Sequence, residues 1–313
     1  MIAVDSMAVA DRTDARGIDP QTFTALRPYL FSIAYRMLGS ASDAEDVVQD
    51  AYLRMLRTSP RDIRSPKAYL SAVVTRLCLD LLTSRKAERE TYHGPWLPEP
   101  VLTDDLESSP ETATESREDI SLAALVLLER LTPEERATYV LREAFDFPYD
   151  EIAPILGKSI AATRQIAHRA RAHLVDRPRF VASPRDQHRL AERFLSAARE
   201  GDLPTLITTL AADATGWSDG GANALAARRP IQGRDAVARW IMGLQHKHYK
   251  DLRATLAEIN GSVGILEWSG TELVSVRVLG VHEGRIQALY TIVNPDKLCH
   301  LRRRLGNTTL VEA

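Results

Sequence analysis

Residues 43–54 read Asp-Ala-Glu-Asp-Val-Val-Gln-Asp-Ala-Tyr-Leu-Arg, and this stretch carries the strongest indication of the fold. Its apolar residues recur at helical spacing, which predicts an amphipathic helix. Acidic and amide side chains fill the opposite face. Ser42 is the expected N-cap, with Glu45 three residues on as its capping-box partner. A negative helix face does not suit a DNA-binding surface, so the helix indicates a protein partner. The apolar stripe consists of Ala44, Val47, Val48, Ala51 and Leu53 or Met55.

Length and composition bound the class of protein. A chain of 313 residues has room for two or three domains. Its formal net charge of −2 argues against binding nucleic acid over the whole surface. No apolar run approaches the ~20 residues of a membrane span, and residues 1–19 lack the apolar core of a signal peptide. Cys78 and Cys299 lie far apart in sequence, which favours a cytoplasmic protein without a cysteine metal site.

The charges alternate along the chain. Residues 61–89 are mainly basic, residues 99–119 are strongly acidic, and residues 158–193 are basic again. Any one block fits a solvated helix face equally well. The alternation of two basic blocks around an acidic spacer favours a functional interpretation, with nucleic acid as the partner of the basic blocks.

Residues 21–86 have a helical pattern throughout, with Gly39 as a C-cap and Pro66 in the first turn of a helix. Residues 91–118 have the composition of a linker, rich in proline and acids. Within it, Trp96-Leu97-Pro98-Glu99-Pro100 is unusually apolar. We expect this segment to dock on a folded surface.

A helix-turn-helix pattern follows. Thr132-Pro133-Glu134-Glu135 predicts a capped helix start. Residues 149–157 then form a short helix ending at glycine, and Ser159 caps a basic helix that extends to residue 174. Arg and Gln side chains on such a helix can read guanine and adenine in the major groove. The alternative is a helical hairpin with a basic surface, but the caps and the glycine turn favour DNA binding.

The last third of the chain predicts a compact α+β domain. A helix ends at Gly201, two further helical stretches follow, and residues 252–294 show strand-like segments broken by glycines. Asp219, in Trp217-Ser218-Asp219-Gly220-Gly221, has two interpretations. It could be a general base in an apolar cone, or a structural aspartate in a Gly-Gly turn, and the missing partner acid or base favours the second. His246 and His248 are too weak a pair to predict a metal site.

Three motifs carry a resemblance to a known family: the acidic stretch 43–51, residues 131–136 and residues 159–171. On these, residues 23–86 resemble region 2 and residues 128–174 resemble region 4 of bacterial sigma-70-type factors of the extracytoplasmic-function (ECF) group. Three more segments resemble signatures of a subgroup with a fused SnoaL-like (NTF2-like) domain. They are Trp96-Leu97-Pro98-Glu99-Pro100, Asp219-Gly220-Gly221 and Asn294-Pro295-Asp296-Lys297-Leu298. The chain departs from the family pattern at Thr75-Arg76, Ile160, Ile166 and Ala222-Asn223.

The resemblance implies a multidomain protein. Two all-α sigma domains, a region 2 helical bundle and a region 4 helix-turn-helix, precede a C-terminal α+β SnoaL/NTF2-like cone. The expected order is a flexible N-terminus at 1–19, region 2 at 20–90, an acidic Pro-rich linker at 91–120, region 4 at 121–178 and the SnoaL-like domain at 179–313.

The resemblance also implies partners and site residues, namely the β′ clamp helices and β subunit of core RNA polymerase and the −35 and −10 elements of promoter DNA. It implies no catalytic residue, metal or cofactor, and leaves open a small ligand in the fused domain. The residues expected to bind core polymerase are Asp43, Glu45, Asp46, Gln49, Asp50 and Arg54. Those expected to bind DNA are Arg61, Arg64, Lys67, Arg76, Arg85 and Lys86, then Ser159, Ala162, Arg164, Gln165, His168 and Arg169. The regulatory residues are Trp96, Pro98, Asp219, Gly220, Gly221, Asn294, Pro295, Asp296 and Lys297.

The leading hypothesis is a transcription initiation factor tuned by its fused domain. One alternative is a one-component DNA-binding regulator whose C-terminal domain senses a ligand; it leaves the acidic helix without a role. Another is a SnoaL-like enzyme. We further expect the Trp96 segment and residues 294–298 to pack together or onto the C-terminal domain, and so to set the spacing of the two DNA-binding regions.

Overall fold

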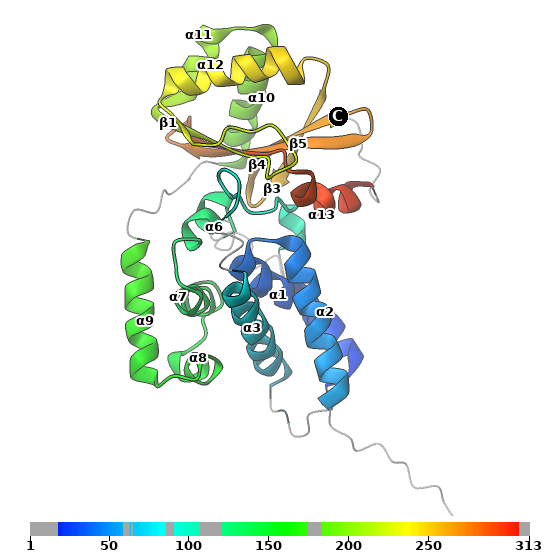
Figure 1. Cartoon of the computed structure of the whole chain (residues 1–313), viewed down its shortest axis with the longest axis vertical. Helices are drawn as coiled ribbons and strands as arrows, with labels where there is room; N and C mark the ends of the chain where they lie inside the picture. The colour runs from blue at the N-terminus through cyan, green and yellow to red at the C-terminus, as the bar shows by residue number, and fades with distance from the viewer. Residues whose placement is uncertain are drawn as a thin grey trace, which may run out of the picture.

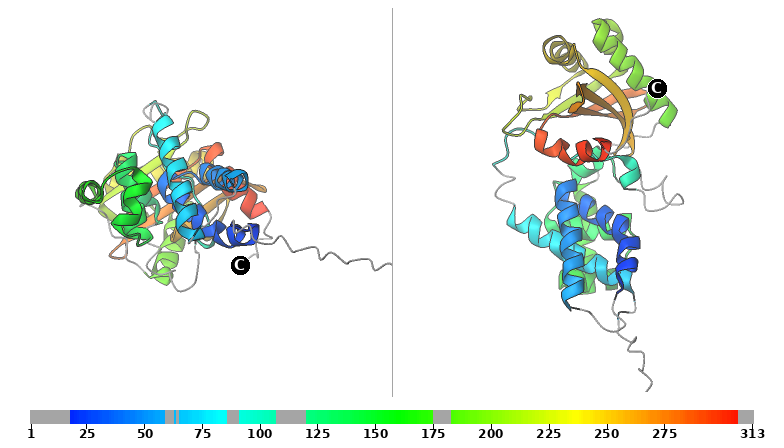
Figure 2. Two further views of the ribbon diagram at one scale, coloured as in Figure 1. Left: turned by 90° about the horizontal axis from the view of Figure 1, so that it is seen from below. Right: turned by 90° about the vertical axis from the view of Figure 1, so that its right-hand side faces the viewer.

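A computed structural model describes residues 18–58, 63, 65–85, 91–106, 120–174 and 183–306. The molecule is elongated, with a helical part at one end and a sheet domain at the other (Figure 1). The C-terminal helix lies between the two parts, and a view from the side shows the same layering (Figure 2). No helix in the described ranges is both long and apolar enough to span a membrane.

The N-terminal bundle consists of α1 (Pro20–Leu38), α2 (Ala41–Thr58) and α3 (Pro66–Ser84). Gly39 ends α1 in the left-handed conformation, at φ 65°, as the sequence predicts. Ser65 caps α3 and Pro66 occupies its first turn, also as predicted. The acidic stretch forms α2, and its apolar stripe is buried in the bundle.

The expected cap of α2 is wrong by two residues. The helix begins at Ala41, so Ser42 lies inside its first turn rather than before it. Ser40 is the residue at the N-cap, and its hydroxyl accepts a hydrogen bond from the Asp43 amide at 3.1 Å. Glu45 bonds to Arg27 and does not close a capping box. The amides of Ala41 and Ser42 donate to the carboxylate of Glu99, which is distant in sequence, so no local pattern could indicate this second cap.

A second helical unit consists of α6 (Leu122–Leu128), α7 (Pro133–Tyr139), the π-helical turn η2 (Val140–Ala144), α8 (Tyr149–Leu156) and α9 (Ile160–His173). Thr132 and Glu135 form the predicted capping box. Gly157 ends α8 with φ 64°, and Ser159 caps α9. Helix, glycine turn and capped helix therefore follow one another as the sequence predicts, and α9 lies on the outer side of the helical part (Figure 1).

The sheet domain begins with α10 (Pro184–Glu200) and α11 (Leu203–Thr209), and α12 (Arg234–Leu244) with the π-helical turn η3 (Gln245–Tyr249) follows the first strands. Six strands pair in the order β2-β1-β6-β5-β4-β3. The strands are β1 (Leu210–Asp219), β2 (Ile231–Gln232), β3 (Arg253–Ile259), β4 (Ser262–Ser269), β5 (Glu272–His282) and β6 (Arg285–Ile292). The predicted antiparallel meander is β3 to β6, and α13 (Pro295–Gly306) follows it.

The sequence pattern missed β1. This strand lies parallel to β6, so its partner is far away along the chain. Its burial does not alternate regularly, which removes the period-two signal of a strand. The omission matters because β1 ends at Asp219, a candidate site residue.

The described residues form two apolar cores. One lies between the sheet and α10, α11 and α12, around Phe194, Ile241 and Leu279. The other is continuous from α1 through the linker and the helix-turn-helix unit to α13 and the opposite face of the sheet. Leu97, Val101 and Leu106 of the linker are fully or almost fully buried in it. The helical parts and the sheet domain therefore share one core, and the linker runs through it.

Candidate functional site

The linker meets the sheet domain at an aspartate–lysine pair, which we term the linker clamp and define as Asp219, Lys297 and Leu97. Lys297 Nζ lies 2.7 Å from Asp219 Oδ2 and also donates to the Leu97 carbonyl. The Leu97 amide donates to the same Asp219 oxygen at 2.8 Å. Asp219 is completely buried and Lys297 nearly so. A buried ion pair that also bonds the backbone fixes this part of the linker on the sheet domain.

Aromatic residues of the linker complete the clamp. The Lys297 ammonium lies 4.0 Å from the ring centre of Trp96 and 4.9 Å from that of Tyr92. The Tyr92 hydroxyl donates to Asp219 Oδ1 at 2.6 Å. The pKa of Tyr92 is raised, first because the hydroxyl is buried and second because it donates to the Asp219 carboxylate. A cation between two ring faces is stabilised by their quadrupoles.

The structure explains why Gly220, Gly221, Asn294 and Pro295 stand next to the clamp. A Cβ on Gly220 would lie 2.4 Å from the Ala224 carbonyl oxygen, and one on Gly221 would lie 2.6 Å from Asn294 Nδ2. Asn294 Oδ1 accepts from the Asp296 amide at 3.1 Å, so Asn294 caps α13. Pro295 occupies the first position of that helix, and Lys297 is thereby aimed at Asp219.

The structure thus brings together the three segments that hold the residues expected to be regulatory, and Pro98 of the first segment lies next to Gly39 at the end of α1. The expected packing of the Trp96 segment against residues 294–298 is confirmed by these contacts. Spacing along the chain did not reveal the partner of Asp219, because Lys297 follows it only after the whole meander. Asp219 faces the linker, where its carboxylate is taken up by four donors, so the geometry supports the structural interpretation rather than a general base.

The sequence analysis did not predict a second set of buried contacts, which centres on Asn260. Asn260, completely buried in the β3–β4 turn, donates to the Tyr35 hydroxyl at 2.7 Å and to the Ile120 carbonyl at 3.0 Å. Its side-chain oxygen accepts from the Val101 amide at 3.2 Å. The backbone there is left-handed, at φ 51°, which asparagine tolerates better than most residues. A single side chain therefore joins α1, the linker and the approach to α6. The only sequence signal was an Asn-Gly turn.

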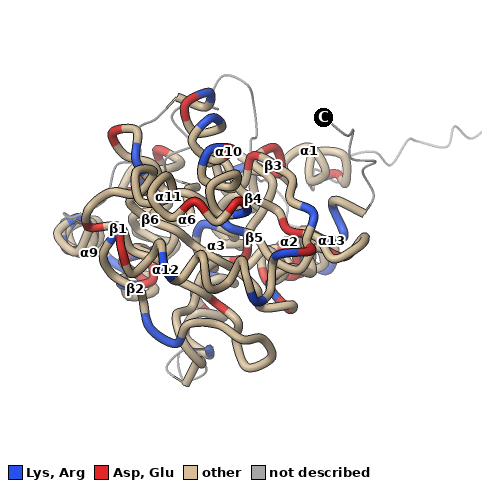
Figure 3. Tube along the Cα trace, turned by 90° about the horizontal axis from the view of Figure 1, so that it is seen from above, with Lys and Arg blue, Asp and Glu red and all other residues tan. Residues whose placement is uncertain are grey.

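The residues expected to bind polymerase divide into two sets. Asp46, Gln49, Asp50 and Arg54 lie on an exposed face of α2. Asp43 and Glu45 are partly buried and form ion pairs with Arg85 and Arg27 respectively. Basic α13 lies near the start of α2, and its Arg304 has a raised pKa through Asp105 first and Glu45 as a minor contribution. Figure 3 shows these acidic and basic stretches among α2 and α13.

The basic residues of α3 make contacts within the protein. The Lys67 ammonium lies 4.1 Å from the ring centre of Tyr29, and Arg85 bonds to Asp43. Arg76 donates to the Pro154 carbonyl at 2.8 Å and to the Ile155 carbonyl at 3.3 Å, at the C-terminal end of α8. Three further DNA-binding candidates, Arg61, Arg64 and Lys86, lie outside the described residues.

On α9, Arg164, Gln165, His168 and Arg169 are exposed, Ser159 is the cap, and Ala162 is half-buried. Arg169 pairs with Glu135 at 3.4 Å, and the Arg164 guanidinium lies 5.8 Å from the ring centre of Tyr149. Burial alone would raise the pKa of Glu135, but its hydrogen bonds with Thr132 and Arg169 outweigh this and lower it. The exposed face of α9 thus carries Arg and Gln side chains, which are residue types that can read base edges in a major groove.

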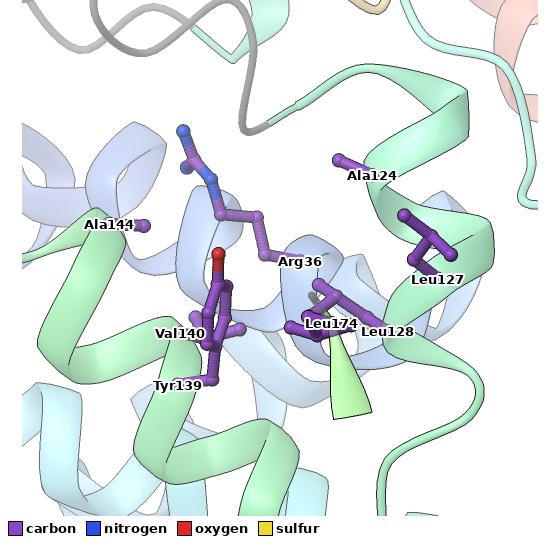
Figure 4. Close-up of a pocket in the computed structure, with 8 residues that line it drawn as sticks. All are labelled: Arg36, Ala124, Leu127, Leu128, Tyr139, Val140, Ala144 and Leu174. Carbon is purple, nitrogen blue, oxygen red and sulfur yellow. The ribbon is translucent and has the colours of Figure 1, made fainter. Parts of the chain in front are cut away.

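The two helical units pack directly on each other. Phe145 stacks edge-on with Tyr29 at 5.2 Å between ring centres, and Arg36 lies 5.0 Å above the same ring. Arg136 donates to the Met37 carbonyl at 2.9 Å. The cavity beside Arg36 and Tyr139 is small, about 10 Å³, and mainly apolar (Figure 4). It has room for about one water, so this interface is close-packed.

The sheet domain also hides an ion pair that the sequence did not indicate. Glu267 on β4 and Arg277 on β5 lie 3.1 Å apart, and both are almost completely buried. Burial raises the pKa of Glu267, although Arg277 opposes this. The Thr291 hydroxyl beside them on β6 has no hydrogen-bond partner among the described residues. Part of the interior of the domain is therefore polar, and these residues are neighbours only because of the register in which the strands pair.

Comparison with known proteins identifies the family. Residues 22–88 match the family model described as Sigma-70 region 2, and residues 121–174 match Sigma-70, region 4. The chain is 40% identical over 287 residues to the ECF RNA polymerase sigma factor SigJ of Mycobacterium tuberculosis, covering 88% of this chain and 91% of that protein. This chain is an ECF sigma factor.

The similarity of this ECF sigma factor to its relatives extends into the sheet domain. The crystal structure of Mycobacterium tuberculosis SigJ matches with a TM-score of 0.71 and 37% identity, over 90% of this chain and 98% of that one. The probable ECF sigma factor SigI of the same species is 32% identical over 286 residues, covering 90% of this chain and 95% of its own. The fold is therefore that of helical regions 2 and 4 followed by a sheet domain that falls within the match to the SigJ structure.

Family membership settles the class of function. ECF sigma factors are transcription initiation factors, and their regions 2 and 4 imply binding to core RNA polymerase and to promoter DNA. The one-component regulator is not favoured, because it gives no account of region 2. Leu97 is bonded to Asp219 of the fused domain, and the Ser40 hydroxyl of region 2 donates to the Glu99 carboxylate at 2.7 Å, so the linker lies between region 2 and the fused domain of this sigma factor.

Proposed function

We propose that the fused SnoaL-like domain modulates this ECF sigma factor through the linker clamp. The observation that carries the proposal is the position of Leu97: its amide and carbonyl are bonded to Asp219 and Lys297 of the fused domain. Two residues further on, Glu99 is bonded to region 2. Only Pro98 separates the residue bonded to the fused domain from the residue bonded to region 2, so a shift of Asp219 or Lys297 is passed to region 2 over a short stretch of chain.

The exposed face of α2 is the proposed docking surface for the β′ clamp helices of core polymerase. Asp46, Gln49, Asp50 and Arg54 share that face, and the hydrophobic side chains of Leu53 and Leu56 are 38% and 49% exposed beside them. A helix face that combines acids with exposed apolar side chains suits a protein partner with basic residues around an apolar contact.

Promoter contacts are divided between two surfaces in this proposal. The basic segment from Arg61 to Lys86, including Lys67, Arg76 and Arg85, contacts the −10 element. The N-terminal half of α9 reads the −35 element, with Arg164 and Gln165 facing base edges and Arg169 facing phosphates. Supporting this division, α9 carries its polar residues on one exposed face of a capped helix.

The packed form must open for both surfaces to work together. Arg76 of α3 is bonded to the end of α8, so a −10 candidate is held against the unit that carries the −35 candidates. Reading two separate promoter elements at once requires α3 and α8 to separate. The interface around Phe145 that would be lost is close-packed, so polymerase binding has to offset its loss.

Run-off transcription with core polymerase tests the proposal. Wild-type protein, Asp219→Asn, Lys297→Met and a chain ending after residue 174 are compared on one promoter template. We expect promoter-dependent transcript from the wild type and a changed yield from both clamp variants. Equal transcript from the wild type and both clamp variants would refute modulation through the clamp. A tight complex with palindromic DNA in the absence of polymerase would instead favour the one-component regulator.

A further inference from the structure

The N-terminus of α2 is capped by a residue of the linker. The first amides of a helix have no partner within the helix and need one from elsewhere. In α2, the amides of Ala41 and Ser42 both donate to Glu99 Oε2, each at 3.1 Å. The hydroxyls of Ser40 and Ser42 also donate to the Glu99 carboxylate, at 2.7 and 3.2 Å. The Glu99 carboxylate therefore supplies hydrogen-bond acceptors to the first amides of α2, although it lies at least 57 positions away in sequence.

Two features make Glu99 a strong cap for α2: it is buried, and its carboxylate is charged. Glu99 is only 7% exposed, so its hydrogen bonds are shielded from water. They are charge-assisted, and the carboxylate sits at the positive end of the helix dipole. Ser40 alone satisfies the next amide, that of Asp43, at 3.1 Å. Without Glu99, the two leading amides would lose their only partners among the described residues.

Glu99 is held in place from both sides. Its amide donates to the Gly39 carbonyl at 2.8 Å, and its carbonyl accepts from the Tyr35 hydroxyl at 2.6 Å. Gly39 leaves no room for a side chain, because a Cβ there would lie 2.7 Å from the Trp96 ring. Leu97, two residues earlier, is fixed by the linker clamp. The prolines on either side of Glu99 restrict φ, so a shift of Leu97 displaces the carboxylate rather than being absorbed.

The capped turn leads directly into the proposed docking surface. Asp46 lies about one turn beyond Ala41, and the remaining residues of the face follow on the same helix. Helix ends fray when their leading amides lose partners, and the loss reaches about one turn. The first turn of α2 therefore depends on the linker, and the linker depends on the fused domain.

We infer that Glu99 is a positioning residue for polymerase binding: by capping α2 it transmits the state of the linker clamp to the affinity for core polymerase. The inference rests on the proposed docking role of α2 and deepens it. It gives the fused domain a supporting role, since an engaged clamp orders the docking helix. Opening the clamp and removing the cap should then weaken core binding in the same direction.

The test uses full-length protein and core polymerase, with binding measured by fluorescence anisotropy of labelled sigma factor. Glu99→Gln keeps the size of the side chain but removes its charge. We expect its affinity for core to fall about five- to tenfold, the scale of a lost helix cap. Asp104→Asn is the matched control, because Asp104 is an exposed carboxylate of the same linker. Its affinity should not change.

A rescue variant separates positioning from general damage. Ser40→Asp in the Glu99→Gln background gives α2 a local aspartate cap without restoring the linker contact. Restored core affinity supports the inference. Hydrogen exchange of the Ala41 and Ser42 amides should be faster in Glu99→Gln and slower again in the rescue variant. Faster exchange with unchanged core affinity, or restored protection without restored affinity, would overturn it.

Asp46→Lys distinguishes this inference from the proposed function. If Asp46→Lys and Glu99→Gln both leave core affinity unchanged, the docking surface itself is wrong. If Asp46→Lys weakens binding while Glu99→Gln does not, the docking surface stands and the positioning role of Glu99 falls.

Discussion

Asn260 Nδ2 donates a hydrogen bond to the Tyr35 hydroxyl at 2.7 Å, across 225 positions of sequence. Tyr35 in turn donates to the Glu99 carbonyl at 2.6 Å. Region 2, the linker and the fused domain thus meet in one buried chain of hydrogen bonds. Burial raises the pKa of the Tyr35 hydroxyl, so it remains a donor at every physiological pH. Such a network is costly to break, because each buried group would lose its partner.

Asn260→Gly is the first test of this network. Glycine keeps the left-handed backbone but removes the bonds to Tyr35, Ile120 and Val101. We expect the free energy of unfolding to fall by about 2–4 kcal/mol in denaturant titration. Glu283→Gly is the matched control, since Glu283 is also left-handed, at φ 49°, but its side chain is 86% exposed. A loss at Glu283 as large as at Asn260 would show that backbone freedom, not the network, is responsible.

Lys297→Met tests the linker clamp. The substitution leaves Asp219 buried without its cation, so we expect a loss of about 3–5 kcal/mol in unfolding free energy. Protease cleavage between residues 91 and 106 should become faster. Adding Asp219→Asn should recover part of the stability. Lys158→Met removes an exposed ion pair with Glu134 and should cost no more than about 1 kcal/mol. Equal losses from the two lysines would contradict the clamp.

Charge reversal on α2 tests the docking surface. Asp46→Lys changes an exposed side chain, so the fold should be retained while affinity for core polymerase falls about tenfold or more. The effect should shrink as salt is raised, because exposed charges are screened. Glu192→Lys, at an exposed position of α10 in the fused domain, is the control of equal charge change. A parallel loss of affinity in the control would point to net charge rather than to α2.

Substitution on α9 tests promoter reading. With core polymerase present, Gln165→Ala should weaken binding to the preferred −35 element by about 1–3 kcal/mol and relax discrimination at one base position. Arg169→Ala should weaken binding to all sequences alike and reduce the salt dependence. Arg189→Ala on α10 controls for lost positive charge. Unchanged base preference in every α9 variant would remove that helix from the −35 contact.

Acid stability tests the contact between the linker and α13. Burial alone would raise the pKa of Asp105, but the nearby His300 ring, 3.8 Å away, and the hydrogen-bonded Arg304 guanidinium outweigh it and lower the pKa below its usual range. A lowered folded-state pKa stabilises the fold above about pH 4, and this contribution is lost as pH falls through the folded value. Asp105→Asn should therefore flatten the loss of stability below about pH 4. Asp104→Asn, at an exposed neighbouring position, should leave the decrease of the unfolding free energy below about pH 4 as it is in the wild type.

Local chemistry explains what the sequence predicted well. Gly39, Thr132 and Ser159 each end or begin a helix as expected, because caps depend on neighbours within about four residues. The exposed face of α2 follows from apolar periodicity alone. Motif resemblance added the family and its two sigma regions, because their order and separation are specific. The Asn-Gly at 260–261 was visible only as a turn.

The contacts that define the candidate site come from the tertiary structure. The sequence by itself determined the helices of both helical units, the caps of α3, α7 and α9, and the amphipathic faces of α2 and α9, since these depend on short-range spacing. Only the tertiary structure decided that Glu99 caps α2, that Lys297 neutralises Asp219 and that Asn260 bonds to Tyr35. The physical reason is that a buried polar group needs a partner but does not specify its distance along the chain. The fold supplies that partner by bringing remote segments into one core.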